Sequence, residues 1–152
     1  MSKKRRQILQ RAATWEKDRI YLTNVEKSFL GLGQKEERPY VVLKYYRPDF
    51  ECFSAWDSAE LKAFSNFLMK LRFAEWRDVY ATAGKAGTKK GFGYTPHKDR
   101  NRLPDDPELS DISPDITFFE LRVTQKARVH GFRVKSAFFL VWLDRNHQIY
   151  PG

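Results

Sequence analysis

The sequence contains only one cysteine, Cys52, and only three histidines among its 152 residues. A single cysteine excludes a disulfide bond within the chain and a metal site built from cysteines alone. The three histidines are too scattered to form a motif with the spacing of metal ligands. The sequence therefore predicts no metal site and no other cofactor.

Long apolar segments are also missing. The longest apolar run, residues 137–143, has the length of a strand, whereas a membrane-spanning helix needs about 20 apolar residues. The basic start, residues 1–6, has no apolar segment behind it and therefore lacks the form of a secretory signal. These absences predict a soluble, cytoplasmic protein without a membrane partner.

Positive charge is the strongest bulk property of the chain. Lysine and arginine number 28 against 19 aspartates and glutamates, which gives a net charge of +9. A basic surface attracts polyanions and accelerates their encounter with the protein. The charge therefore favours a nucleic-acid partner, although a basic protein without such a partner remains an alternative.

Local patterns predict an α+β fold with one domain at residues 39–152, preceded by a basic helical extension at residues 1–38. Branched and aromatic residues predict a strand at residues 40–46. A capping-box pattern at Asp57 and Glu60 begins a helix whose apolar face would comprise Leu61, Phe64, Leu68 and Leu71. A second, shorter helix is expected at residues 74–82, with Trp76, Val79 and Tyr80 facing the core.

Three further strands are predicted at residues 117–124, 127–134 and 137–143. Their short connections favour an antiparallel meander, which would form one twisted sheet with the earlier strand. The last of them is apolar on both faces, so we expect it in the interior of the sheet.

A long basic loop at residues 84–115 separates the helices from these strands. It has no sustained periodicity, and loops of this length are typically functional or disordered. Its glycines and lysines do not match the phosphate-binding P-loop motif. Lysines and arginines in its first part are predicted to bind RNA: Lys85, Lys89, Lys90, Lys98 and Arg100, with Arg102 nearby.

Polar side chains recur on one face of the predicted meander. Alternation places Glu120 and Arg122 opposite the apolar side chains of their strand, and Arg128 shares a face with His130 on the next strand. The turn after the last strand brings His147 to the sheet edge. We therefore expect Glu120, Arg122, Arg128 and His147 to converge on a solvent-facing surface.

These residue types are sufficient for RNA cleavage without a metal. Glutamate and histidine can remove a proton from the 2′-hydroxyl group or donate one to the leaving 5′-oxygen. Arginine is suited to the charge on phosphate because its donors form a rigid, permanently charged fork. A solvated cross-strand pair of Glu120 with Arg122 or Arg128 explains the same pattern, and that alternative stays open.

The segment from Arg122 to Phe132, the apolar strand behind it and residues 146–150 resemble the C-terminal half of RelE/YoeB-type toxins. The order of a strand, two helices and three strands is also similar to theirs. The resemblance implies a small α+β ribonuclease that cuts messenger RNA, usually on the ribosome, blocks translation and is neutralised by a cognate antitoxin.

The resemblance also implies roles for individual residues. Arg128 matches the phosphate-stabilising arginine, His147 the terminal acid or base, and Tyr150 the terminal aromatic residue of that family. Arg122 and Lys126 match basic residues that orient RNA. Glu120 has no counterpart in the family, so its catalytic assignment depends on its residue type and its predicted face.

Two departures from the family leave other functions open. The N-terminal extension and the long basic loop lengthen a normally compact family, and related members poison DNA gyrase without the nuclease residues. One alternative is a non-catalytic nucleic-acid-binding or host-factor-binding protein of phage or mobile-element origin. Another is a basic domain that binds a protein.

Overall fold

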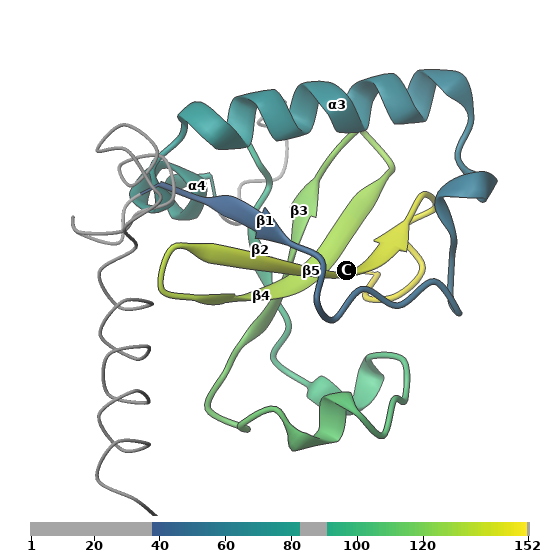
Figure 1. Ribbon diagram of the computed structural model, residues 1–152, viewed down its shortest axis with the longest axis vertical. Helices are drawn as coiled ribbons and strands as arrows, with labels where there is room; N and C mark the ends of the chain where they lie inside the picture. Colours follow the sequence, from purple (N-terminus) through teal and green to yellow (C-terminus); the bar gives the residue numbers. More distant parts are fainter. Residues whose placement is uncertain (1–37, 83–90, 152) are drawn as a thin grey trace, which may run out of the picture.

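The structure, a computed structural model, describes residues 38–82 and 91–151, which form an α+β fold with a mixed five-stranded sheet (Figure 1). The strand order is β1-β5-β4-β3-β2. The strands are β1 (Tyr40–Val42), β2 (Thr95–Pro96), β3 (Phe118–Arg122), β4 (Arg128–Val134) and β5 (Ala137–Asp144), and the helices are α3 (Ser58–Phe73) and α4 (Trp76–Ala81). The predicted N-terminal helix lies outside the described residues.

The antiparallel meander is confirmed. β3 pairs with β4 and β4 pairs with β5, both antiparallel, within one or two residues of the predicted strand ends. β5 is an interior strand as expected, because β1 pairs with its other side in parallel. Two elements far apart in the sequence thus lie side by side, and the parallel pair makes the sheet mixed.

The prediction of an irregular loop at residues 84–115 is wrong for part of its length. β2 lies within it and pairs antiparallel with β3 at the second edge of the sheet. Two short 3₁₀ helices follow, η2 (Arg100–Arg102) and η3 (Leu109–Asp111). β2 was not predicted because it is only two residues long and contains a proline. Sheets accept proline only at positions such as an edge strand.

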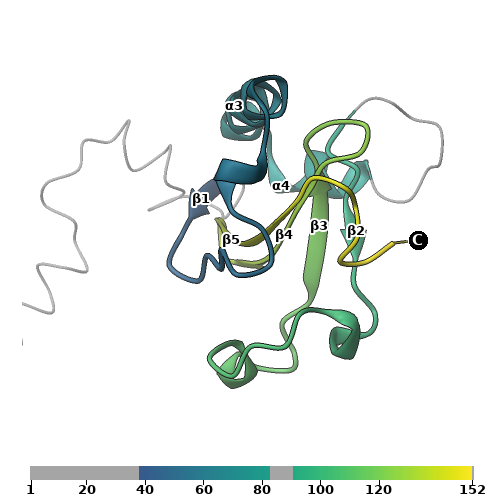
Figure 2. The ribbon, with the colours of Figure 1, turned by 90° about the vertical axis from the view of Figure 1, so that its right-hand side faces the viewer.

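Helices α3 and α4 cover one face of the sheet (Figures 1 and 2). The capping box of α3 is confirmed, since the Glu60 amide donates to Asp57 at 2.8 Å and the Asp57 amide donates to Glu60 at 3.1 Å. The predicted apolar face is wrong in part: Phe67 and Leu71 are buried, whereas Leu61 is 38% exposed.

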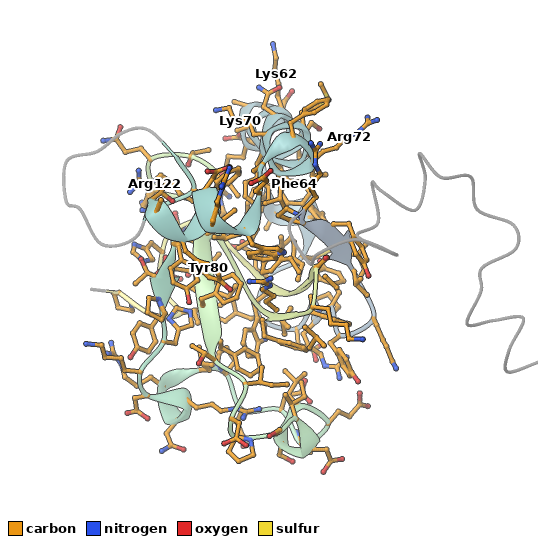
Figure 3. The ribbon with its side chains drawn as sticks, turned by 90° about the vertical axis from the view of Figure 1, so that its left-hand side faces the viewer. Lys62, Phe64, Lys70, Arg72, Tyr80 and Arg122 are labelled. Carbon is orange, nitrogen blue, oxygen red and sulfur yellow. The ribbon has the colours of Figure 1, made fainter. Side chains whose placement is uncertain are left out.

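The orientation of α3 is visible in the side-chain view. Figure 3 shows Phe64 on the underside of α3, toward the sheet, and Lys62, Lys70 and Arg72 directed outward. The helix is therefore rotated relative to the expected face, and Phe67 takes the buried place that Leu68 was predicted to have.

The opposite face of the sheet is also covered, so the expectation that it faces solvent is wrong. The segment at residues 97–116 lies beside this face (Figure 2) and contributes Leu103 and Leu109 to a second apolar core with Phe118, Phe132 and Trp142. Arg47 fixes the middle of this segment, because it forms ion pairs with Asp106, at 2.6 Å, and with Glu108. Polar residues on this face consequently lie between two layers of protein.

A β-bulge in β5 changes which side chains share this second face. The register passes from His130↔Trp142 to Gly131↔Leu140, which leaves Val141 as the extra residue. The Val141 carbonyl instead accepts a hydrogen bond from the Arg47 amide at 2.8 Å. Because the bulge shifts the alternation by one residue, Leu143 packs in the core under the helices. Asp144 therefore lies on the same face as His130.

Candidate active site

Glu120, Arg128 and His147 meet on the second face of the sheet. His147 Nε2 lies 3.1 Å from Glu120 Oε1 and 2.9 Å from Glu120 Oε2. Arg128 Nε lies 3.2 Å from Glu120 Oε2. The expected convergence of these three residues is confirmed, while their catalytic roles remain predictions. We call this group the Glu120 cluster.

Burial distinguishes the members of the Glu120 cluster. The exposed fraction of the side chain is 3% for Glu120, 11% for Arg128 and 29% for His147. The alternative of a solvated cross-strand pair is therefore wrong for Glu120 and Arg128, which pair inside the protein. Of the three side chains, His147 is the one that a substrate can reach.

Arg128 is largely occupied by protein partners. One of its terminal nitrogens donates to the carbonyls of Thr124, Gln125 and Ala127, which are all in the turn between β3 and β4. Burial lowers the pKa of Arg128, although the nearby charge of Glu120 acts in the opposite direction. In this geometry Arg128 holds the turn and balances the charge of Glu120, whereas the predicted role was direct contact with phosphate.

His147 occupies the turn that follows β5. Its backbone has a φ of 53°, a left-handed conformation that few non-glycine residues adopt. The turn carries the imidazole back to β3, where the buried carboxylate of Glu120 holds Nε2. Glu120 thus fixes the orientation of the ring, and the histidine remains partly open to solvent.

A second chain of buried polar groups lies beside the first. His97 Nε2 is 2.8 Å from His130 Nδ1, and His130 Nε2 is 2.8 Å from Asp144 Oδ2. All three residues are at least 95% buried, with exposed fractions of 5%, 0% and 1% for His97, His130 and Asp144. We call these residues the histidine chain.

Asp144 ends the histidine chain inside the protein. Its two carboxylate oxygens accept the backbone N–H groups of Gln148, at 2.7 Å, and Ile149, at 2.9 Å, in addition to His130. Burial by itself raises the pKa of Asp144, but the hydrogen bonds from His130, Gln148 and Ile149 outweigh it and lower the pKa. Asp144 is therefore ionised at neutral pH.

Tyr150 covers the outer end of the histidine chain. Its ring centre lies 4.2 Å from that of His97, and its hydroxyl oxygen accepts the Asp99 amide at 3.2 Å. The guanidinium carbon of Arg102 lies 4.2 Å from the same tyrosine ring. Tyr150, predicted as a catalytic residue, is thus packed against His97, and no contact with the Glu120 cluster is found for it among the described residues.

The predicted RNA-binding residues have different environments. Lys98 and Lys126 are exposed, and Arg122 lines a groove of about 1060 Å³ with Lys70 and Phe92. Arg100 instead donates to the carbonyls of Leu109, Ile112 and Ser113 and lies over the Phe118 ring. It therefore holds together the segment at residues 97–116, which we call the covering segment. Lys85, Lys89 and Lys90 lie outside the described residues.

Sequence analysis missed His97 and Asp144 as site residues and considered His130 only as a residue on the face of its strand. The one useful signal was the alternation of β4, which placed His130 on the face of Arg128. Across residues 38–82 and 91–151, no three histidine, cysteine or acidic side chains are grouped so that they could hold a metal ion. Likewise, none of the helices in that part of the chain has the length and apolar character needed to cross a membrane.

Comparisons with protein-family models, with curated proteins and with solved structures found no match to this chain.

The histidine chain predicts a loss of stability in acid. Burial and, secondarily, the charge of His130 lower the pKa of His97 from 6.5 to about 3. Between these two pH values the unfolded chain binds a proton at His97 that the folded protein does not bind. The free energy of unfolding should therefore decrease as the pH falls from 6.5 toward 3, by about 1.4 kcal/mol per pH unit for this proton.

Urea denaturation of the wild type and of His97→Gln between pH 7.5 and 4 measures this contribution. Asp144, whose folded pKa is lowered, also loses stability in acid, but it does so in both proteins. We expect the free energy of unfolding to fall less steeply with acidification in the variant. Equal slopes in the two proteins would show that His97 does not titrate as its burial requires.

Proposed function

We propose that this protein is a metal-independent endoribonuclease in which His147 transfers a proton during cleavage. The observation that carries the proposal is the bond between the partly exposed imidazole of His147 and the buried carboxylate of Glu120. A carboxylate in this position accepts the hydrogen on Nε2 and leaves Nδ1 as the nitrogen that takes up or releases the transferred proton. The buried Arg128 supports this arrangement because its positive charge offsets that of Glu120.

The chemistry requires no metal. The RNA 2′-oxygen attacks the adjacent phosphorus atom once its proton is removed, and the 5′-oxygen leaves once it receives a proton. Histidine suits both transfers at neutral pH because its ordinary pKa lies close to that pH. A buried carboxylate that orients the ring and offsets the charge of its protonated form fixes the geometry of either transfer.

Phosphate binding is best assigned to exposed cations. Lys98 and Arg102 are exposed and lie on the segment that covers the histidine chain, whereas Arg128 is occupied inside the protein. The net charge of +9 supports attraction of RNA to this surface. This changes the residue assignment that the toxin resemblance implies, while the reaction type stays the same.

The toxin-like fold is part of the same proposal. A RelE-like arrangement is supported by the order of the elements, which is β1, α3, α4, β3, β4 and β5, and by the single sheet that contains the four strands. On this proposal messenger RNA is the substrate, the ribosome is a candidate site of cleavage, and a cognate antitoxin is the expected partner. β2 and the segment at residues 97–116 would be additions to that arrangement.

Cleavage of a labelled RNA by the purified full-length protein in EDTA tests the proposal. We expect products with a 2′,3′-cyclic phosphate from single-stranded RNA and no products from DNA of the same sequence, which lacks the attacking hydroxyl. The same RNA should be tested free and on translating ribosomes. Salt-sensitive RNA binding without cleavage in either setting would contradict the nuclease and support the non-catalytic binding protein.

A further inference from the structure

The hydrogen positions in the histidine chain follow from its buried end. The Asp144 carboxylate already accepts two backbone N–H groups and is ionised, so it can only accept a hydrogen from His130 Nε2. When His130 is uncharged, its Nδ1 carries a lone pair and accepts a hydrogen from His97 Nε2, 2.8 Å away. His97 therefore carries its hydrogen on Nε2.

This assignment leaves His97 Nδ1 as an acceptor without a donor. The atom is buried and has no hydrogen-bond partner among the described residues. Buried polar atoms are nearly always paired, so a water or a ligand group is expected to donate to this atom. A ligand hydroxyl group would supply the missing hydrogen.

Space for a ligand lies beside His97. A hollow of about 350 Å³ is lined by His97, Lys98 and Thr117 together with residues of the covering segment. Lys98 brings a positive charge to this hollow, and Arg102 lies over the neighbouring Tyr150 ring. The backbone of His97 is held by its amide, which donates to the Phe118 carbonyl at 2.8 Å. A base with fixed geometry thus lies beside the cationic side chain of Lys98.

We infer that His97 is the general base of this site: its Nδ1 accepts the proton of the RNA 2′-hydroxyl, and His147 donates a proton to the leaving 5′-oxygen. The inference rests on the proposed ribonuclease function and assigns a residue to each of its two proton transfers. Glu120, which holds His147, lies opposite His130, which holds His97, in the register of β3 and β4, so the two imidazoles belong to one site.

The histidine chain makes His97 an effective base although it is buried. The substrate 2′-hydroxyl group loses its proton to His97 Nδ1. At the same time, the proton on His97 Nε2 passes to His130 Nδ1. The positive charge then resides on His130, 2.8 Å from the carboxylate of Asp144. His97 itself stays neutral, so no unpaired charge is created in the buried site.

Nuclear magnetic resonance of ¹⁵N-labelled histidine rings at pH 7.5 tests the hydrogen assignment without reference to activity. We expect His97 Nε2 and His130 Nε2 to carry hydrogens and His97 Nδ1 to carry none. An oligonucleotide that retains the 2′-hydroxyl should shift the His97 Nδ1 signal on binding, whereas its 2′-O-methyl counterpart should not. A hydrogen on His97 Nδ1 in the free protein would overturn the inference whatever the activity.

Cleavage by His97→Gln and His97→Ala tests the role in catalysis. Glutamine can still donate a hydrogen bond to His130 but cannot take up a proton, so we expect a fall of about 10²- to 10⁴-fold in rate with the fold retained by circular dichroism. Added imidazole should restore part of the activity of His97→Ala, which repair of a purely structural defect would not explain.

The outcomes separate the two proposals. If His97→Gln cleaves RNA as fast as the wild type, the inference is wrong and the proposed nuclease stands. If the wild type cleaves no RNA, the proposed function fails and the catalytic role of His97 fails with it. The ring signals then still show whether Nδ1 is unprotonated.

Discussion

Replacement of His147 by asparagine is expected to lower the rate of RNA cleavage by about 10²- to 10⁴-fold, the usual contribution of one general acid or base. Asparagine tolerates the left-handed backbone that His147 adopts, with its φ of 53°. The variant thus keeps the turn but removes the imidazole to which the proton transfer is assigned.

Single-turnover cleavage of a 5′-labelled RNA in EDTA measures the effect, and Asn146→Ala is the matched control. Asn146 occupies the same turn and is exposed, so its replacement should leave the cleavage rate within about twofold, in line with the small effects of most surface substitutions. Thermal denaturation should show both variants folded. Equal rates for His147→Asn and the wild type would show that the proton is transferred elsewhere.

Local sequence patterns predicted the meander and the faces of two of its strands. Period-two alternation is a direct consequence of strand geometry, so Glu120 was placed correctly on the face opposite Phe119 and Leu121, which pack in the core under the helices. The capping box at Asp57 was also predictable, because both of its hydrogen bonds span only three residues.

The features that build the histidine chain depend on contacts between distant parts of the chain. Strict alternation along β5 places Asp144 under the helices, and only the bulge at Val141 turns it toward His130. His97 lies just beyond a two-residue edge strand that local propensity does not mark. Glu120 is held by His147, which lies 27 residues further along the chain in a turn whose position no periodicity could predict.

The two polar groups are adjacent parts of one buried system. In the register of the sheet Glu120 lies opposite His130, and Arg128 lies opposite both Arg122 and Asp144. Burial of two carboxylates, two histidines and an arginine between apolar layers is costly, and well-packed apolar residues often give equal or greater stability. Such departures from the simplest stable core are expected at functional sites. The cost of burying these groups therefore favours an active site over a purely structural network.

Replacement of Asp144 by alanine is expected to lower the free energy of unfolding by about 3–5 kcal/mol, because each buried donor left without an acceptor costs about 1–3 kcal/mol. The change would leave three donors without an acceptor: His130 Nε2 and the amides of Gln148 and Ile149. No water can replace the carboxylate easily, because Asp144 is only 1% exposed. Urea denaturation at pH 7.5 measures the loss.

Two further variants make this result specific. Asp144→Asn keeps one acceptor oxygen but turns an amide N–H₂ group toward the other donors, so its loss of stability should be smaller than that of Asp144→Ala yet clearly measurable. Asp115→Ala removes an exposed carboxylate and should change the free energy of unfolding by no more than about 0.5 kcal/mol. If Asp144→Ala were as stable as Asp115→Ala, the carboxylate would not anchor His130, and the proton path from His97 would lose its buried end.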